Sequence, residues 1–481
     1  MSFEVKHTDV LNQGAFISIE SQQSIYNFYD YESIYCTHKE DKRLKNEIIE
    51  IIDSAETVLK ICSFIITDDE IFEVLIDKAT STDVVIFILT QFDAKKMTSR
   101  SDNLDFITEE EIAEKPEVKH LSNIKKLYDV GVHVRASESA HAKFIISDRD
   151  KGFITSANLT TPSLNENMES GVYMDEESSQ ELDKLFDIIY QKGTNYTKFL
   201  DSSSSNKMFV ISSDVDDTFE NLPAPEDSNL RYTFTESHTN LLEQIIKCID
   251  EANDFIYLST YSIVGLQNIQ EFVEAIKKAN QRDVLVNIFC RAMNYRNDHI
   301  VASQFLAELG CDIFANYDNH SKGIVTENEA MIFTANIDGN HGLTNGFEVG
   351  YILNDEQYDD FLNFHKELIY NSNHRFKIRQ KRTDLFKTFY KYEIFKKLKP
   401  PTIPQEIIIS ANKEMNIDIE DFKNLPIFYN VSERFTHVTV GHFTYEATFS
   451  GNIFSIINKL PFQYNKEKYL LKFYSLILEI N

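Results

Sequence analysis

The chain has 481 residues, of which 42% are hydrophobic, a composition typical of a globular protein with two to four domains of about 100–200 residues each. Its formal net charge of −28 means that the average surface repels DNA, RNA and anionic lipid, so binding a polyanion requires a local basic patch or a partner. No apolar run approaches the roughly 18 residues of a membrane-spanning helix, and the N-terminal segment lacks a signal-peptide pattern. We therefore expect a cytoplasmic protein without a membrane span.

The five cysteines are scattered along the chain and include no C-x-x-C pair. This pattern favours neither a disulfide framework nor a zinc site. Cys62, Cys248 and Cys290 lie in apolar runs, so we interpret them as small buried side chains in a protein of a reducing compartment.

An internal repeat relates residues 43–180 to residues 237–365. In chain order, the first copy predicts helix 44–55, strand 58–67, helix 71–79, strand 83–90 and a helix–strand segment at 124–136. The second copy predicts helix 240–252, strand 254–264, helix 269–280, strand 283–290 and a helix–strand segment at 302–315. Strands that alternate with helices of this length predict an α/β fold with a mixed sheet.

The segments outside the repeat differ from it in composition. Residues 201–235, rich in Ser, Asp and Pro, predict a linker between a first half at 1–200 and a second half at 236–372. Residues 373–481 predict a basic connector and an accessory domain. Within them, residues 374–399 hold ten Lys or Arg against two acidic residues, a formal +8. This run is either a solvated helix or hinge face or a nucleic-acid-binding strip. The candidate substrate-binding residues in it are Arg375, Lys377, Arg379, Lys381 and Arg382.

Each copy of the repeat carries the same motif of chemically active residues. The first copy contains His141, Lys143, Asp148, Ser156, Asn158 and Glu169. The second contains His320, Lys322, Glu327, Thr334, Asn336 and Glu348. The spacing from His to the last Glu is 28 residues in both copies, and the spacing from His to Asn is 17 and 16. One H-x-K motif is weak in a chain with 13 His, but two copies at equivalent places in a repeat indicate an active site.

The motif suggests how a phosphodiester could be held. Side chains alternate faces along a strand, so His141 and Lys143 are predicted to share a face, as are Ser156 and Asn158. Two such surfaces would surround a phosphodiester, with the lysines and asparagines holding its non-bridging oxygens. One imidazole could then attack phosphorus while the other acts as general acid and base.

The acidic residues of the motif have two predicted roles. Glu169 and Glu348 are the candidates for a carboxylate on the far ring nitrogen of a histidine, where it fixes the tautomer. Asp148 and Glu327 lie an odd number of positions from the histidines, so we predict that they face away and form structural ion pairs. Ser156 and Thr334 are expected to support the site.

H-x-K-x4-D followed by S-x-N resembles the signature of the phospholipase D superfamily, over roughly residues 40–370. The resemblance implies two phospholipase D-like α/β/α sandwich halves in a pseudo-twofold arrangement, to which the C-terminal pattern adds a small α+β accessory domain. It also implies phosphodiester cleavage through a phosphohistidine, without metal or cofactor, with His141 as nucleophile and His320 as general acid and base. The reverse assignment of the two histidines stays open.

The substrate is inferred from finer similarity. Residues 156–160 and 167–171 look like segments of nuclease-type members found in bacterial restriction and defence systems. We therefore expect a nuclease, active on DNA more than RNA, as a monomer or homodimer that a helicase or another DNA-binding subunit could assist. The alternatives are a phospholipid hydrolase or transferase and a catalytically weak nucleic-acid-binding module. Other histidines are interpreted as structural, namely His120, His133, His238, His299 and His341.

Overall fold

In a computed structural model, the protein divides into two compact units. Unit 1 comprises residues 1–24, 292–317 and 372–481, and unit 2 comprises residues 25–291 and 318–371. The structure describes residues 3–7, 14–19, 31–39, 41–92, 116–201, 208–212, 222–234, 236, 238–294, 296–379, 402–411, 427–431, 436–440, 443–450, 453–460 and 472–480. For the described residues within 3–7, 199–201, 208–212 and 402–480, it gives only the backbone. The two copies of the histidine motif both belong to unit 2.

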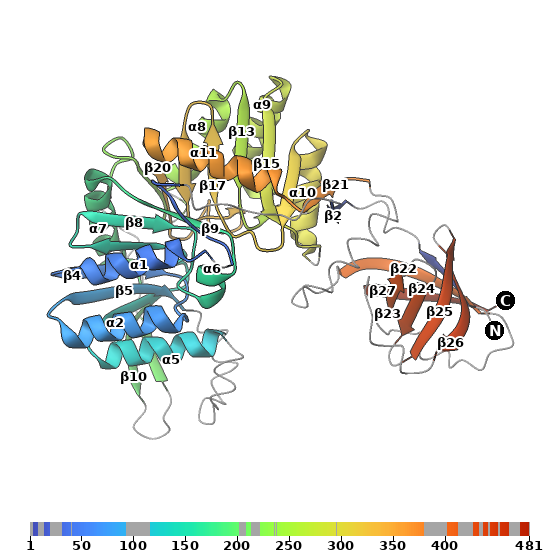
Figure 1. Ribbon diagram of the computed structural model, residues 1–481, viewed down its shortest axis with the longest axis horizontal. Coiled ribbons are helices and arrows are strands. Elements are labelled where there is room, and N and C mark those ends of the chain that lie inside the picture. The colour runs from blue at the N-terminus through green and yellow to red at the C-terminus, as the bar shows by residue number, and fades with distance from the viewer. Residues whose placement is uncertain are drawn as a thin grey trace. The chain divides into compact units, whose positions relative to one another are not determined.

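The first part of unit 2 is built on a sheet in the order β11-β10-β6-β5-β4-β7-β8-β9-β3 (Figure 1). Strands β4, β5 and β6 are parallel, while β7, β8 and β9 continue the sheet as an antiparallel meander from β4. The elements are β3 (Tyr35–Thr37), α1 (Arg43–Ser54), β4 (Val58–Ser63), α2 (Asp69–Ser81), β5 (Val85–Gln91), α5 (Pro116–Asp129), β6 (His133–Ser137), β7 (Phe144–Ser147), β8 (Lys151–Thr155), α6 (Thr161–Asn165), β9 (Glu169–Tyr173), α7 (Glu176–Lys192), β10 (Tyr196–Asp201) and β11 (Met208–Ser212).

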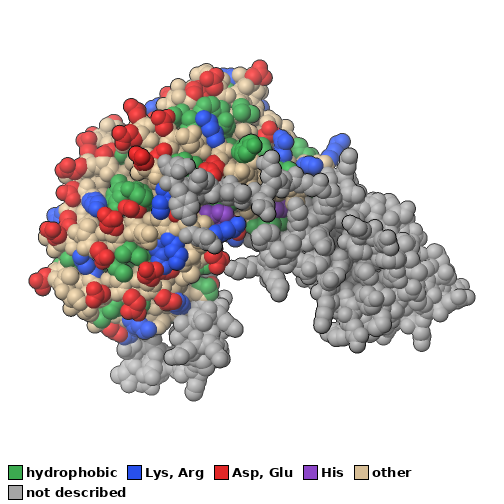
Figure 2. Space-filling view, in the orientation of Figure 1, with side chains coloured by type: hydrophobic (Ala, Val, Ile, Leu, Met, Phe, Trp, Pro, Cys, Tyr) green, Lys and Arg blue, Asp and Glu red, His purple; other side chains and the backbone are tan. Residues whose placement is uncertain are grey.

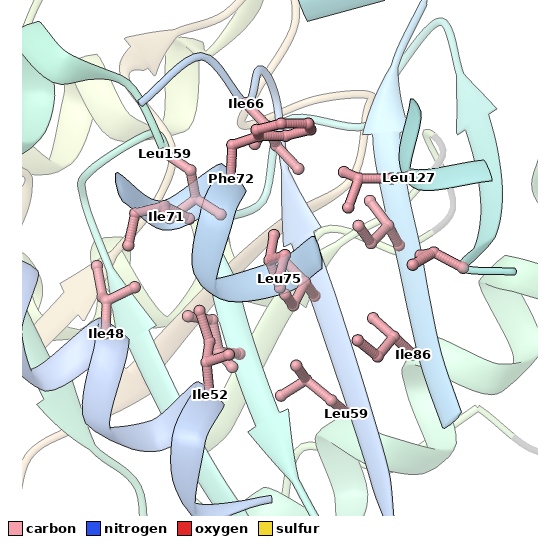
Figure 3. Packing of buried hydrophobic residues seen from close by; sticks show 14 of the residues in the cluster. Ile48, Ile52, Leu59, Ile66, Ile71, Phe72, Leu75, Ile86, Leu127 and Leu159 are labelled. Atoms are coloured by element: carbon pink, nitrogen blue, oxygen red, sulfur yellow. The ribbon is translucent and has the colours of Figure 1, made fainter. Parts of the chain in front are cut away.

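Strand β4 shows why helices cover both faces of this sheet. Leu59 and Ile61 point into the main hydrophobic core, where they pack with residues of α1, α2 and α5 (Figure 3). Lys60, which alternation turns to the opposite face, contacts Asp183 at 2.5 Å and Asp187 at 2.8 Å on α7. The sheet is therefore a middle layer between α7 on one face and α1, α2 and α5 on the other.

The second part of unit 2 repeats this plan, with strands in the order β12-β20-β18-β17-β13-β15. Its elements are β12 (Leu230–Thr233), α8 (Asn240–Glu251), β13 (Phe255–Ser259), β14 (Ile263–Val264), η2 (Leu266–Asn268), α9 (Gln270–Gln281), β15 (Leu285–Arg291), β17 (Gly323–Thr326), β18 (Ala330–Phe333), β19 (Ile337–Asp338), β20 (Glu348–Ile352) and α11 (Asp355–Tyr370). Strand β13 pairs parallel with β15 and antiparallel with β17, as β4 does with β5 and β7. The predicted α/β class with mixed sheets is confirmed.

Side-chain caps fix where several helices begin. Asp68 accepts a hydrogen bond from the backbone N–H of Ile71 at the start of α2, and Asp175 accepts one from Ser178 at the start of α7. Asn354 forms a reciprocal capping box with Gln357 at the start of α11. These caps satisfy N–H groups that have no partner within the helix, so the polar residue before each apolar run sets the helix boundary.

Unit 1 joins segments from distant parts of the sequence. It contains a closed sheet in the order β1-β22-β27-β23-β24-β25-β26 and a three-strand set in the order β16-β21-β2. Its elements are β1 (Phe3–His7), β2 (Ala15–Ser18), α10 (Asn297–Glu308), β16 (Asp312–Asn316), β21 (His374–Lys377), β22 (Thr402–Ala411), β23 (Ile427–Val431), β24 (Thr436–Val440), β25 (Phe443–Ser450), β26 (Ile453–Leu460) and β27 (Lys472–Ile480). The pairing of β1 with β22 and β26 was not predicted from the sequence. Residues 380–401, 412–426 and 461–471 lie outside the described residues, so the helical part of the predicted α+β domain remains a prediction.

Two general expectations can be compared with the described residues. All five cysteines are buried and none forms a disulfide, which confirms the interpretation of Cys62, Cys248 and Cys290 as buried side chains. Among the helices that the structure describes, none combines the length and the apolar character needed to cross a bilayer.

Asp148 and Glu327 close equivalent turns by accepting backbone hydrogen bonds, and neither forms the predicted ion pair with any residue that the structure describes. Asp148 accepts hydrogen bonds from the backbone N–H groups of Glu56, Thr57 and Val58, at 2.8, 2.7 and 3.1 Å. Glu327 accepts from the backbone of Asn253 and Phe255, at the equivalent place before β13. Both carboxylates thus bind backbone donors that precede a strand, where a basic side chain is not needed. Burial alone would raise the pKa of Asp148, but the Thr57 hydroxyl and these N–H groups hold it below its ordinary value.

Asp148→Ala should therefore destabilise the fold by about 1–3 kcal/mol, because three backbone donors lose a charged acceptor. The free energy of unfolding from urea denaturation measures the loss. Asp150→Ala in the same turn is the matched control, since Asp150 is exposed, and should change stability by less than about 0.5 kcal/mol. Equal losses in the two variants would contradict the assigned role.

Candidate active site

The motif residues gather at the strand ends of unit 2. His141 and Lys143 immediately precede β7, whereas Ser156 and Asn158 follow β8. The expectation that these pairs lie on strands is therefore wrong by a few residues. The physical reason is that the ladder between β7 and β8 ends where Thr155 N–H donates to the Lys143 carbonyl, at 3.1 Å. Beyond that point, the backbone N–H of His141 donates instead to Phe347 in the other copy of the repeat, at 3.1 Å.

Two equivalent backbone bridges connect the copies. Ala140 pairs with Phe347, and Asn319 pairs with Met168, each as an isolated parallel bridge. The N–H of His320 donates to the Met168 carbonyl at 3.1 Å, which mirrors the bond from His141 to Phe347. Because Glu169 follows Met168 and Glu348 follows Phe347, each bridge brings a histidine of one copy beside the glutamate of the other.

The histidines and glutamates are consequently paired across the copies. His141 Nδ1 lies 2.5 Å from Glu348 Oε1, and His320 Nδ1 lies 2.7 Å from Glu169 Oε1. Both carboxylates are fully buried, at 1% and 0% exposure. A carboxylate at Nδ1 favours the proton on that nitrogen and leaves Nε2 as the ring nitrogen for chemistry.

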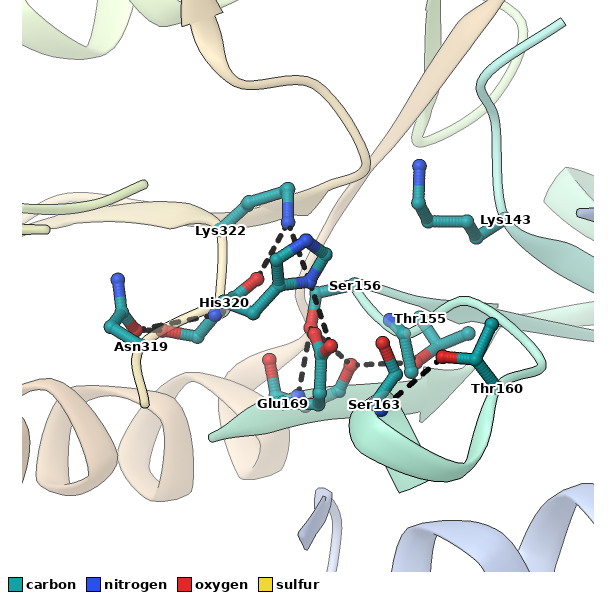
Figure 4. Close-up of polar contacts among 12 residues, drawn as sticks. Lys143, Thr155, Ser156, Thr160, Ser163, Glu169, Asn319, His320 and Lys322 are labelled. Atoms are coloured by element: carbon teal, nitrogen blue, oxygen red, sulfur yellow. Dashed lines mark hydrogen bonds and ion pairs between the residues drawn. The ribbon is translucent and has the colours of Figure 1, made fainter. Parts of the chain in front are cut away.

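Ser156 and Thr334 orient the two carboxylates. The Ser156 hydroxyl donates to Glu169 Oε2 at 2.6 Å, and the Thr334 hydroxyl donates to Glu348 Oε2 at 2.5 Å. Figure 4 shows Ser156 and Glu169 together beneath the His320 ring. Each carboxylate thus uses one oxygen for the hydroxyl of its own copy and the other for the histidine of the opposite copy, which fixes its rotation.

Two buried ammonium groups accompany the rings. Lys143 is 1% exposed and donates to the backbone carbonyl of His141, while Lys322 is 0% exposed and donates to that of His320 at 2.6 Å. Each Nζ also lies near the Nδ1 of its own histidine, at 3.1 Å for Lys143 and 3.2 Å for Lys322. Burial lowers the pKa of both lysines, to about 7 for Lys322, while Glu169 and Glu348 oppose that shift. Figure 4 shows His320 between the two lysines.

The four groups share one electrostatic environment. Burial lowers the pKa of His320 to about 4, which Glu169 opposes and the charges of Lys322 and Lys143 reinforce. Burial also lowers the pKa of His141, where Glu348 opposes the shift and both lysines reinforce it. The rings differ in access, since the His141 side chain is 31% exposed and the His320 side chain 15%. Because each ring senses the lysine of the other copy, the two motifs lie at one site rather than at two.

Both carboxylates are kept ionised by the cations around them. Burial alone would raise the pKa of Glu169, but His320 and Lys322 lower it below its ordinary value. Glu348 is affected in the same way by His141 and Lys143.

Asn158 and Asn336 occupy equivalent positions after β8 and β18. Their Oδ1 atoms are buried and accept no hydrogen bond from the part of the chain that the structure describes. An amide oxygen is an acceptor and a phosphodiester offers no donor, so any phosphate contact would have to come from the Nδ2 groups of these side chains. Their role as phosphate-binding residues remains a prediction.

Aromatic rings position both histidines, and sequence reasoning missed them. Phe64 packs edge-on against His141, and Tyr261 packs in the same way against His320, each with ring centroids 5.0 Å apart. The two aromatics are equivalent, because each follows the first strand of its copy. An aromatic residue at this place in both copies was the available signal. Next to His320, the buried side chain of Asn319 accepts a hydrogen bond from the Ser321 hydroxyl at 2.7 Å. Its Nδ2 donates to the Thr260 carbonyl at 2.8 Å.

The predicted substrate-binding strip does not belong to unit 2. Arg375 and Lys377 lie on β21 in unit 1, with both side chains exposed, and Arg375 forms an ion pair with Asp312 of β16. Arg379 is exposed, and Lys381 and Arg382 lie outside the described residues. The strip therefore remains a prediction. Among the described residues, no cluster of three or more His, Cys, Asp or Glu side chains could hold a metal ion.

The crossed pairing predicts which ring responds to each glutamate. Glu348→Gln removes the negative charge that raises the pKa of His141, so the pKa of His141 should fall further. Glu169→Gln, the matched control, should lower the pKa of His320 and change that of His141 much less. NMR titration of the imidazole signals measures both. A larger response of the histidine in the same copy as the substitution would refute the crossed arrangement.

Comparisons with known proteins identify similar sequences. A family model described as "Cardiolipin synthase, PLD-like domain" matches residues 48–190, which contain the first copy of the motif. The virion nicking-joining enzymes of monkeypox virus and of vaccinia virus (strain Copenhagen) are each 23% identical over 266 residues, which cover 46% of this chain. The chain spans only 62% of the length of these curated relatives.

Two solved structures overlap with the chain more loosely. Phosphatidylserine synthase of Haemophilus influenzae Rd KW20 is 12% identical, with a TM-score of 0.48 over 80% of this chain and 97% of its own. Nuc of Salmonella typhimurium, a phospholipase D family member, is 18% identical, with a TM-score of 0.27 over 30% of this chain and 96% of its own. These overlaps are too loose to carry an argument. The matched family model and the similarity to the viral enzymes support a relationship to the phospholipase D superfamily.

Proposed function

We propose that the protein is a metal-independent phosphodiesterase that cleaves nucleic acid, DNA in preference to RNA, through a phosphohistidine intermediate. The observation that carries the proposal is the reciprocal pairing of His141 with Glu348 and of His320 with Glu169, beside two buried lysines. This arrangement supplies two imidazoles of fixed tautomer and two cations around one site, which is what a two-step displacement at phosphorus requires. The equivalence of the contacts in the two copies supports a pseudo-twofold relation between them.

In the first step, His141 Nε2 attacks phosphorus and the bond from phosphorus to the leaving oxygen breaks. His320 gives its proton to that oxygen, so a phosphohistidine and a neutral alcohol form. The greater exposure of His141 favours it as the nucleophile. His320 must be protonated at this stage although its pKa is about 4 in the free protein. The negative charge of a bound phosphodiester would offset the lysine charges and raise that pKa.

In the second step, neutral His320 takes a proton from water while the water oxygen attacks phosphorus. The bond between phosphorus and His141 breaks, which releases a phosphomonoester and restores both rings. Lys143, Lys322 and the amides of Asn158 and Asn336 would hold the non-bridging oxygens in both steps, where charge accumulates in the transition state. No step in this scheme calls for a metal ion.

Nucleic acid is the proposed substrate because of the motif segments at 156–160 and 167–171 and the similarity to enzymes named for nicking and joining. The charge of the chain is unfavourable for this substrate. Figure 2 shows Asp and Glu side chains scattered over the visible face of unit 2. With a net charge of −28, delivery of nucleic acid by a helicase or another DNA-binding subunit remains part of the proposal. The lipid enzyme in the description of the matched family model makes phospholipid the competing substrate.

A substrate panel in EDTA tests the function. We expect turnover of single- or double-stranded DNA that exceeds turnover of RNA and of phospholipid vesicles. His141→Asn and His320→Asn should each lower kcat by at least about 10²–10⁴, because each removes a group that forms or breaks a bond. His133→Asn is the matched control, since His133 is an exposed histidine of β6 and should leave kcat unchanged.

Three outcomes would change the proposal. Phospholipid turnover without nucleic-acid turnover would replace the substrate class. Activity that survives both active-site substitutions would place the chemistry elsewhere. Protein denatured during turnover and analysed by mass spectrometry should carry the phosphoryl adduct on His141, and an adduct on His320 would reverse the roles of the two rings.

The pH dependence of kcat/KM should include the titration of the Lys322 ammonium group. With a pKa of about 7, its ammonium group loses its proton as the pH rises through neutrality, so kcat/KM should fall more steeply above about pH 7 than the loss of the His320 proton alone would produce. Lys322→Arg keeps the positive charge at alkaline pH, so the fall of kcat/KM should begin at a higher pH. An alkaline limb at the same pH in Lys322→Arg would assign the titration to another group.

A further inference from the structure

One position near the histidines differs in charge between the two copies of the site. Gln91 ends β5 in the first copy, and Arg291 ends β15 in the second. The register confirms the equivalence, because Val85 pairs with Val58 in the first copy and Leu285 pairs with Phe255 in the second. A neutral amide on one side is therefore matched by a guanidinium on the other.

Arg291 is held close to His320. Its guanidinium lies over the Tyr261 ring at 5.4 Å from the ring centroid, and Tyr261 packs edge-on against His320 at 5.0 Å. The backbone N–H of Arg291 also donates to the Tyr261 carbonyl at 3.2 Å. Arg291 and Tyr261 are both only partly buried, so the pair remains within reach of a ligand. By contrast, the Gln91 amide donates to the backbone carbonyl of Glu138 at 3.3 Å.

The charge of Arg291 also extends into the site. It is one of the groups that lower the pKa of Lys322, after burial and the charge of Lys143. Arg291 thus adds positive charge on the His320 side, whereas each copy contributes the same His, Lys, Asn and Glu set.

This asymmetry has a direct relation to the direction of cleavage. In an in-line displacement at phosphorus, the leaving oxygen lies opposite the attacking atom. If His141 attacks, the leaving strand departs on the side of His320, and its next phosphate lies further along the same side. A guanidinium is well suited to bind that phosphate, because its planar fork can form two parallel charged hydrogen bonds.

We propose that Arg291 is a substrate-binding residue that holds the phosphate adjacent to the scissile one on the leaving strand, with Tyr261 supporting the guanidinium. This inference rests on the proposed function and gives the substrate a direction in the site. Gln91 provides no such charge, so the strand that remains on His141 is held without an equivalent contact at this position.

Arg291→Gln tests the inference, because it gives the second copy the residue of the first. Two substrates are compared, a single-stranded oligodeoxynucleotide and a nucleoside p-nitrophenyl phosphodiester, whose leaving group carries no phosphate. For the oligonucleotide, KM should rise about tenfold with little change in kcat, as expected for the loss of one charged hydrogen-bonded contact. For the p-nitrophenyl ester, both constants should stay the same when both substrates are assayed at about pH 6, where Lys322 is charged with or without Arg291. Lys277→Gln on α9 removes an exposed positive charge and is the matched control, with no change for either substrate.

A binding measurement separates this inference from the proposed function, because it needs no turnover. With His141→Asn protein and the labelled oligonucleotide, the slope of log affinity against log salt should become shallower by about 0.7 when Arg291→Gln is added, the value for one lost phosphate contact on a single strand. Thermal unfolding of the variants checks that the fold is retained. Absence of cleavage by the parent would refute the proposed function, while an unchanged salt slope or an equal KM rise for both substrates would refute the role of Arg291.

Discussion

His141 and His320 each depend on a carboxylate that comes from the other copy of the repeat, and the site exists only because this exchange is reciprocal. Each glutamate is fully buried and ionised, so separating the copies would leave both carboxylates without the histidine that each one contacts. Leaving a buried charge uncompensated costs several kcal/mol. The same contacts that orient the rings therefore also hold the two parts of unit 2 together.

The surrounding scaffold prepares this exchange with backbone bonds. The bridges from Ala140 to Phe347 and from Asn319 to Met168 place each histidine beside the opposite glutamate before any side chain is considered. Asp148 and Glu327 hold the far ends of β7 and β17 to the segments before β4 and β13. Strands β7 and β17, which follow the histidine-bearing segments, are thereby held at their far ends, while the bridges hold the segments that precede them.

Burial gives the site its chemical character within a strongly acidic chain. It lowers the pKa of Lys322 to about 7 and that of His320 to about 4, so both groups can change protonation when an anion binds. An exposed pair would be screened and would titrate at ordinary values. In the proposed mechanism, the negative charge of a phosphodiester would offset the charges of Lys143 and Lys322 and so favour protonation of His320.

The sequence by itself determined the α/β class, the repeat and the motif residues of both copies, because these follow from local periodicity and from equal spacing along the chain. It also identified Glu169 and Glu348 as the carboxylates for the rings. Only the tertiary structure decided that they are exchanged between the copies, that Phe64 and Tyr261 pack on the rings, and that β1 pairs with strands near the other end of the chain. These are contacts between residues far apart in sequence, and their formation depends on how sheets pack and which strand edges meet, which no local pattern encodes.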